Sequence, residues 1–82
     1  MKVNYIPNTC DLDDWEYGEQ SLVWLNDTLI FLYDHSDGFL DITDSKSIVK
    51  AIQDFLDTEE DIEFIESENV PEIVLTEAKG WI

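Results

Sequence analysis

The side chains that most often carry catalysis are scarce in this sequence. It has one histidine, His35, and one cysteine, Cys10. A Ser-His-Asp or Cys-His site would need His35 as its base, because such nucleophiles are activated by a neighbouring imidazole. No sequence feature places Cys10 or Ser36 against it, so we expect a solvated turn histidine and a reduced, partly buried thiol. The sequence therefore predicts a protein that is not an enzyme.

Metal and cofactor sites are not predicted either. A lone cysteine provides no CxxC pair for zinc. Residues 34–44 contain four aspartates and Gly38, which invites comparison with a calcium-binding EF-hand loop. With Gly38 at the sixth position of that loop, Tyr33 and His35 would occupy ligand positions that need carboxylate or amide oxygens. There is no glycine-rich phosphate loop. We expect no cofactor and no specific metal ion.

Carboxylates dominate the chemistry of the chain. It has 20 Asp and Glu against four Lys and no Arg, which gives a formal charge of −16. The ten acidic residues between Lys2 and Lys46 and the ten between Lys50 and Lys79 are interrupted by no basic residue. Two dense clusters stand out: Asp11, Asp13, Asp14, Glu16 and Glu19 in the first half, and Glu59, Glu60, Asp61, Glu63, Glu66 and Glu68 in the second.

The spacing of these carboxylates suggests a phosphate backbone. Alternate residues on one face of a strand lie about 6.6–6.8 Å apart, close to two phosphate steps of roughly 3.4 Å each. A row such as Asp61 and Glu63 is therefore expected to fit a groove built for nucleic acid. Specific affinity also needs desolvated anchors, commonly aromatic. Trp15 and Tyr17 lie among the acids of the first cluster and are the candidate anchors, although Trp15 could instead close the sheet as core.

Length and composition exclude several other classes. The 82 residues predict a single domain, 1–82, and the 44% hydrophobic content favours folding over disorder. No apolar run is long enough to span a membrane, and the first residues lack the apolar stretch of a secretory signal, so we expect a cytoplasmic protein. Direct nucleic-acid binding is not expected, because it needs Lys and Arg to face phosphates. Repulsion between two such chains argues for a monomer.

Hydrophobic periodicity predicts a meander of three antiparallel strands. Residues 21–25 and 28–33 are apolar runs of strand length, joined by Asn26 and Asp27, whose side chains suit a two-residue turn. A second turn at residues 35–38 places Gly38 where a positive φ is needed. Residues 39–43 are predicted as the third strand.

A helix is predicted to follow and to pack on this meander. Asp44 or Ser45 can cap it, and one apolar stripe then recurs at helical spacing: Ile48, Ala51, Ile52, Phe55 and Leu56. Val3 and Tyr5 predict a short strand before Pro7, and residues 62–65 and 73–75 predict two more. The expected fold is α+β, an antiparallel sheet of a three-stranded meander plus short terminal strands, with one main amphipathic helix on one face.

At the level of class, the chain resembles small acidic inhibitors made by bacteriophages and other mobile elements. Anti-CRISPR proteins, anti-restriction proteins and uracil-DNA glycosylase inhibitors share its small size, its acidity and its low cysteine content. The resemblance rests on the two acidic clusters and on the strand–strand–strand–helix order of residues 21–56. It matches no family-specific motif, so no binding residue is carried over by position. It implies a DNA mimic that evades host defence in a bacterial cell by occupying the nucleic-acid site of a Cas effector or restriction-type nuclease.

Three other interpretations of the acidity stay open. An immunity protein would neutralise a basic nuclease toxin with the same electrostatics. An acidic adaptor would bind a basic protein without mimicking nucleic acid. Acidity can also be an adaptation to salt, with no functional cluster. In the first two cases, as in the inhibitor, the partner is a basic protein that contacts the two clusters.

Overall fold

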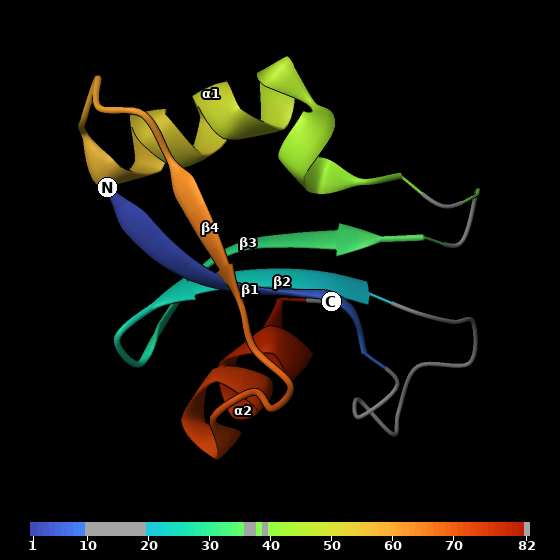
Figure 1. Ribbon diagram of the computed structural model, residues 1–82. Coiled ribbons are helices and arrows are strands. Elements are labelled where there is room, and N and C mark those ends of the chain that lie inside the picture. Colours follow the sequence, from blue (N-terminus) through green and yellow to red (C-terminus); the bar gives the residue numbers. More distant parts are fainter. Residues whose placement is uncertain (10–19, 36–37, 39, 82) are drawn as a thin grey trace.

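The fold is a four-stranded sheet between two helices. The computed structural model describes residues 1–9, 20–35, 38 and 40–81. In chain order its elements are β1 Lys2–Thr9, β2 Gln20–Leu25, β3 Thr28–Asp34, a 3-10 turn Ile42–Asp44, α1 Lys46–Leu56, β4 Glu63–Glu66 and α2 Glu72–Gly80. The spatial order of the strands is β3-β2-β1-β4 (Figure 1). The α+β class predicted from the sequence is confirmed.

The sheet is mixed rather than purely antiparallel. Strand β1 pairs antiparallel with β2, and β2 pairs antiparallel with β3. Strand β4 instead pairs parallel with β1, with Val3 opposite Phe64. Parallel neighbours need a long crossover connection, and here the chain leaves β3 at one edge, forms α1 and returns as β4 at the other edge. This crossover carries the second acidic cluster to the β4 edge.

The β2–β3 turn follows the sequence prediction. Asn26 adopts φ 55°, the left-handed conformation that Asn tolerates better than most residues. In the second predicted turn, at residues 35–38, Gly38 has φ 129°, a conformation that residues with a side chain rarely adopt.

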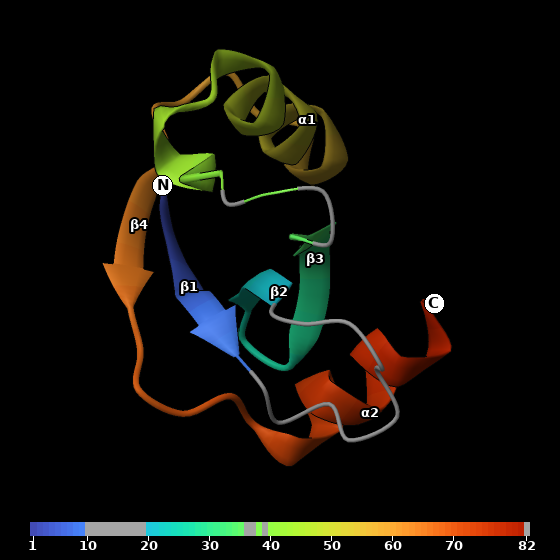
Figure 2. The ribbon, with the colours of Figure 1, turned by 90° about the vertical axis from the view of Figure 1, so that its right-hand side faces the viewer.

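Each face of the sheet packs against its own helix. Leu22 and Trp24 of β2 belong to the cluster that contains Val74 and Ala78 of α2. Val23, which lies between them in β2, belongs to the opposite cluster with residues of α1. Figure 2 shows the sheet between α1 and α2. The prediction of one helix on one face is therefore incomplete, because the sheet is covered on both faces.

Helix α1 forms where the sequence predicts it, with a slightly rotated buried stripe. Its N-cap is Ser45, whose Oγ accepts the N–H of Ile48 at 3.3 Å. Ile48 and Ile52 are buried. Ala51 and Phe55, which the periodicity placed in the stripe, are exposed. The apolar arc of the sequence is wider than the arc that the sheet can cover, so Phe55 remains 56% accessible.

Residues 39–43 do not form the third strand of a meander. Residue 39 lies outside the described residues, and Ile42–Asp44 is a 3-10 turn. The carboxylate of Asp41 accepts the N–H of Thr43 at 3.0 Å and caps this turn, while Ile42 is buried against α1. The cap and the buried Ile42 favour the helical turn over extended backbone. No described strand therefore pairs with the outer side of β3, which is an edge of the sheet, and β1 pairs with the other side of β2.

Residues 73–75 are helical, which corrects the prediction of a last strand. A run of three apolar residues does not distinguish strand from helix. The decisive spacing is Val70, Val74 and Ala78, all buried against the sheet and four residues apart. Val3 and Tyr5 do lie in a strand, and the strand predicted at residues 62–65 is β4, shifted by one residue.

Truncation of the two α1 side chains tests the orientation of this helix. Ile52→Ala should lower the free energy of unfolding by about 2–5 kcal/mol, because it empties a fully buried site. Phe55→Ala should change it by about 0.5 kcal/mol or less, since the ring is mostly in water. Urea denaturation measures both. Equal losses in the two variants would contradict the helix orientation.

Candidate functional site

The second acidic cluster lies along one edge of the sheet. We call its six residues the acidic edge. Three of them precede β4, two are in it and one follows it, and all six side chains are exposed: Glu59, Glu60, Asp61, Glu63, Glu66 and Glu68. The cluster predicted from the sequence is therefore brought together as one continuous, solvent-facing segment.

Apolar side chains within this segment attach it to the core. Ile62 and Phe64 pack against the cluster beneath α1. The ring of Phe64 also meets that of Tyr5 edge to face, with centroids 5.4 Å apart and an interplanar angle of 71°. Such aromatic pairs add to the stability gained from burial alone. The acids are thus held on a strand that the core positions.

The two acids inside β4 project from opposite faces of the sheet. Phe64 faces α1, so Glu66, two residues on, shares that face, and its carboxylate accepts the hydroxyl of Tyr5 at 3.3 Å. Glu63 faces the other side and lies beside Lys2 of β1 in the register. The expected row of Asp61 and Glu63 on a single strand face is therefore not formed, because Asp61 precedes the strand. The acidic edge instead flanks β4 on both faces.

The loop from α1 to β4 has a defined hydrogen-bonded conformation. Asp57 ends the helix in the left-handed conformation, with φ 52°. The N–H of Thr58 donates to the carbonyl of Gln53 at 3.0 Å, and the amide of Gln53 donates to the carbonyl of Glu60 at 2.8 Å. The N–H of Glu60 donates to Thr58 Oγ1 at 3.1 Å. These bonds fix the backbone that carries Glu59 and Glu60.

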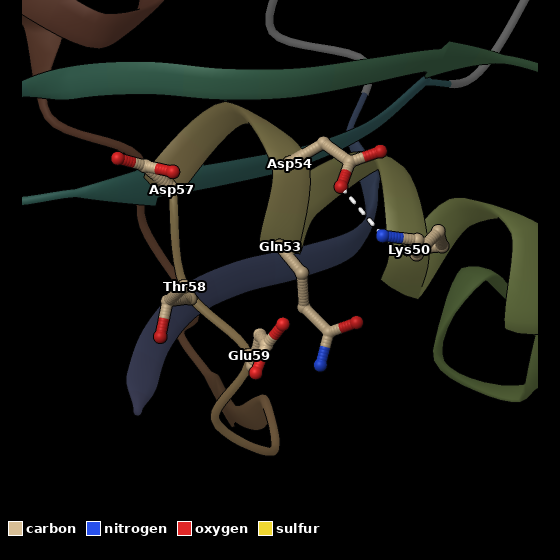
Figure 3. Close-up of a pocket in the computed structure, with 6 residues that line it drawn as sticks. All are labelled: Lys50, Gln53, Asp54, Asp57, Thr58 and Glu59. Atoms are coloured by element: carbon tan, nitrogen blue, oxygen red, sulfur yellow. Dashed lines mark hydrogen bonds and ion pairs between the residues drawn. The ribbon is translucent and has the colours of Figure 1, made fainter.

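A polar hollow lies at the end of α1, next to this loop. Its volume is about 390 Å³, and its lining comprises Lys50, Gln53, Asp54, Asp57, Thr58 and Glu59 (Figure 3). Lys50 Nζ pairs with Asp54 Oδ1 at 2.7 Å, and both side chains are largely exposed, so the pair contributes little to stability. A helix C-terminus carries partial negative charge. With Asp54, Asp57 and Glu59 against Lys50, the lining of the hollow has more negative than positive groups.

Negative charge is distributed unevenly over the described residues. Eight of the fourteen described carboxylates fall within residues 54–68, that is, the end of α1, the loop, β4 and the residue pair after it. Within the described part of the chain, no lysine forms an ion pair with a carboxylate of the acidic edge. The acidic edge is therefore a region of concentrated negative charge, with the Met1 ammonium, which donates to the carbonyl of Asp61 at 2.6 Å, and Lys2 as cations beside it.

The pKa of the Tyr5 phenol is raised, in part by the negative charge of the acidic edge. Partial burial is the largest cause that raises its pKa above the ordinary value of 10.0, followed by the charge of Glu66 and its hydrogen bond to the phenol, and then by Asp41. Each cause disfavours the phenolate, because an anion is poorly solvated there and is repelled by carboxylates.

The first acidic cluster and both candidate anchors lie outside the described residues: Asp11, Asp13, Asp14, Trp15, Glu16, Tyr17 and Glu19. The structure offers a different exposed aromatic, Phe55, next to Asp54 of the hollow. The helical periodicity predicted Phe55 in the core. On the helix it lies between Ala51 and Ile52, inside the apolar stripe, so no local signal in the sequence marked it as exposed.

His35 is not the solvated turn histidine that the sequence predicts. It is half-buried, and its Nε2 lies 2.7 Å from the hydroxyl of Ser21. Ser21 donates its single hydroxyl hydrogen to the carbonyl of Pro7 at 2.6 Å, and the N–H of Leu40 donates to His35 Nδ1 at 3.2 Å. This pattern requires a neutral imidazole with its hydrogen on Nε2, directed at Ser21.

A Ser–His pair in this protonation state does not match a catalytic pair. A general base needs its lone pair directed at the hydroxyl, whereas here the imidazole N–H faces it. Ser21 is also only 1% exposed, so a substrate has no access to its oxygen. The two side chains connect β1, β2 and the end of β3, which is a structural role.

The described residues contain neither a cluster of metal ligands nor a helix that could cross a membrane. No group of three or more His, Cys, Asp or Glu side chains there is arranged to hold a metal ion. Neither α1 nor α2 has the length and apolar character needed to cross a membrane.

Neutralising Glu66 should lower the pKa of Tyr5. In Glu66→Gln the pKa should move toward 10.0 without reaching it, because burial, the largest cause, remains. In the wild type the folded pKa exceeds the unfolded one, so this contribution to stability is complete below pH 10 and is lost as pH rises through the folded pKa. Titration of the Tyr5 ring by NMR measures the change. An unchanged pKa in Glu66→Gln would show that the Glu66 carboxylate does not reach the phenol.

Comparison with known proteins identified no relative. No model of a known protein family matches the chain, and neither a curated protein nor a solved structure matches it.

Proposed function

We propose that this protein is a stoichiometric inhibitor that blocks the nucleic-acid-binding site of a host defence enzyme, such as a CRISPR effector or a restriction-type nuclease, by acidic mimicry. The observation that carries the proposal is the acidic edge, whose six exposed carboxylates occupy one edge of the sheet without ion-pair partners among the described residues. No turnover is involved, and the Ser21–His35 pair has no part in the activity.

The physical gain of such an edge is attraction to a positively charged cleft. Concentrated charge steers encounter and raises the association rate at low salt. The backbone that carries the charges is fixed by the pairing of β4 with β1 and by the hydrogen bonds of the loop. A preorganised polyanion loses less conformational freedom on binding than a flexible single strand would.

The hollow at the end of α1 supports a basic partner in a second way. Arg and Lys are the residues by which nucleic-acid enzymes contact phosphates. A side chain of this kind would meet Asp57 and Glu59 in the hollow, at the negative end of α1. Phe55 lies next to Asp54, with its ring mostly exposed, and supplies the aromatic contact that charge alone does not.

Competition with nucleic acid tests the proposal. Purified CRISPR effectors and restriction-type nucleases would be assayed for inhibition at equal molar concentrations, with and without saturating DNA or RNA. The proposal expects inhibition of one of these enzymes that excess nucleic acid relieves. Binding that saturating nucleic acid leaves unchanged would contradict it and would favour the immunity protein, which can bind beside an active site.

Two matched double variants test whether the acidic edge makes the contact. Glu63→Gln with Glu66→Gln removes two charges from the edge, and Asp27→Asn with Asp44→Asn removes two exposed charges elsewhere. The first pair should weaken inhibition about tenfold or more, mainly through slower association and a shallower salt dependence. The second pair should change it only about twofold. Equal effects of the two pairs, measured by stopped-flow binding, would show that only net charge matters.

A further inference from the structure

Strand β4 is an edge strand whose outer backbone groups have no strand partner in the described part of the chain. The N–H groups of Glu63 and Ser67 donate to the carbonyls of Met1 and Tyr5, at 2.8 and 2.9 Å. Because successive residues of a strand point their N–H and C=O groups to opposite sides, those of Phe64 and Glu66 face outward. Exposed groups of this kind are a template for pairing with another strand.

The opposite edge of the sheet is closed differently. Strand β3 packs against α2, and the N–H of Leu29 donates to the carboxylate of Glu77 at 3.3 Å. The Glu77 side chain therefore satisfies one backbone N–H group at that edge. At β4 no helix side chain within the described residues bonds to the outer backbone groups.

The charges around β4 determine which strand can pair there. In an antiparallel pair of two β4 strands, residues opposite each other share one face of the sheet, so a register centred on Ile65 places each Glu66 opposite Phe64 and diagonal to the Glu66 of the other copy. Like charges that are neighbours across a strand pair repel each other, whereas opposite charges attract. The surrounding acids add to the repulsion between copies and to the attraction of a cation. A basic strand is therefore favoured over a second copy of this chain.

We propose that the outer edge of β4 binds an extended basic segment of the partner protein by strand addition. This inference rests on the proposed function in one respect, namely that the partner is basic. The side chains of β4 predict the order of the partner's residues, two basic residues that flank two apolar ones. The basic residues lie beside Glu63 and Glu66, and the apolar ones beside Phe64 and Ile65, which is already 41% exposed. Backbone hydrogen bonds give such a complex its affinity, and side chains give it specificity.

A cyclic hairpin peptide whose free strand reads Lys-Val-Val-Lys is the direct probe. Cyclisation lowers the ordering cost of a short strand. In an NMR titration at low salt, the peptide should slow hydrogen exchange of the Phe64 and Glu66 amides by about tenfold or more. The same peptide with N-methyl groups along its free edge keeps its charge but cannot form the ladder, and it should not bind. Absence of binding by the first peptide, equal binding by both, or binding without amide protection would overturn the inference.

Two substitutions at Glu66 separate charge from backbone pairing. Glu66→Gln removes the charge and keeps the outward N–H, whereas Glu66→Pro removes both. Proline is tolerated at an edge strand when its missing N–H would face solvent, and the bond from Ser67 to Tyr5 stays available. Glu66→Gln should weaken peptide binding about fivefold or less, and Glu66→Pro should abolish it. Equal affinities of the two variants would overturn strand addition.

The same variants distinguish this inference from the proposed function. If Glu66→Pro and Glu66→Gln inhibit the target nuclease equally while nucleic acid still competes, strand addition is wrong and the inhibitor proposal stands. If the hairpin peptide protects the Phe64 and Glu66 amides but no nucleic-acid enzyme is inhibited, strand addition stands and the inhibitor proposal is wrong.

Discussion

The parallel pairing of β4 with β1 fixes the acidic edge in the folded domain. It joins residues about sixty positions apart in the chain, and it exists because the β3–α1–β4 crossover returns the chain to the far edge of the sheet. Ile62 and Phe64 pack beneath α1 and hold β4 in register. Without this pairing, the acids of residues 59–68 would belong to a loop between α1 and α2 rather than to the edge of the sheet.

The acidity opposes folding, and the two-sided core offsets it. Charges of one sign repel each other and favour expansion, and a domain of this length buries a modest share of its surface. Covering the sheet with α1 on one face and α2 on the other gives two apolar clusters instead of one. Most of the described carboxylates lie at an edge and in loops, where water solvates them and the core is not disturbed.

Local signals in the sequence predicted the elements better than their arrangement. The Asn26 turn, the Ser45 cap and the hydrophobic strands followed from side-chain chemistry that acts over a few residues. The parallel partner of β1 and the second helix depended on long-range packing, which residues 62–65 and 73–75 do not encode locally. The acidic edge was found because charge density is visible in sequence, whereas the exposed Phe55 and the buried Ser21 depend on how neighbouring elements cover them.

Amide hydrogen exchange of β4 in the free protein tests whether β4 pairs with β1. We expect the exchange rates to alternate along the strand. The amides of Glu63 and Ser67, which donate to β1, should exchange slowly, and those of Phe64 and Glu66, which face outward, should exchange fast. Uniformly fast exchange from residue 63 to residue 67 would contradict this pairing, because the acidic segment would then not be part of the sheet.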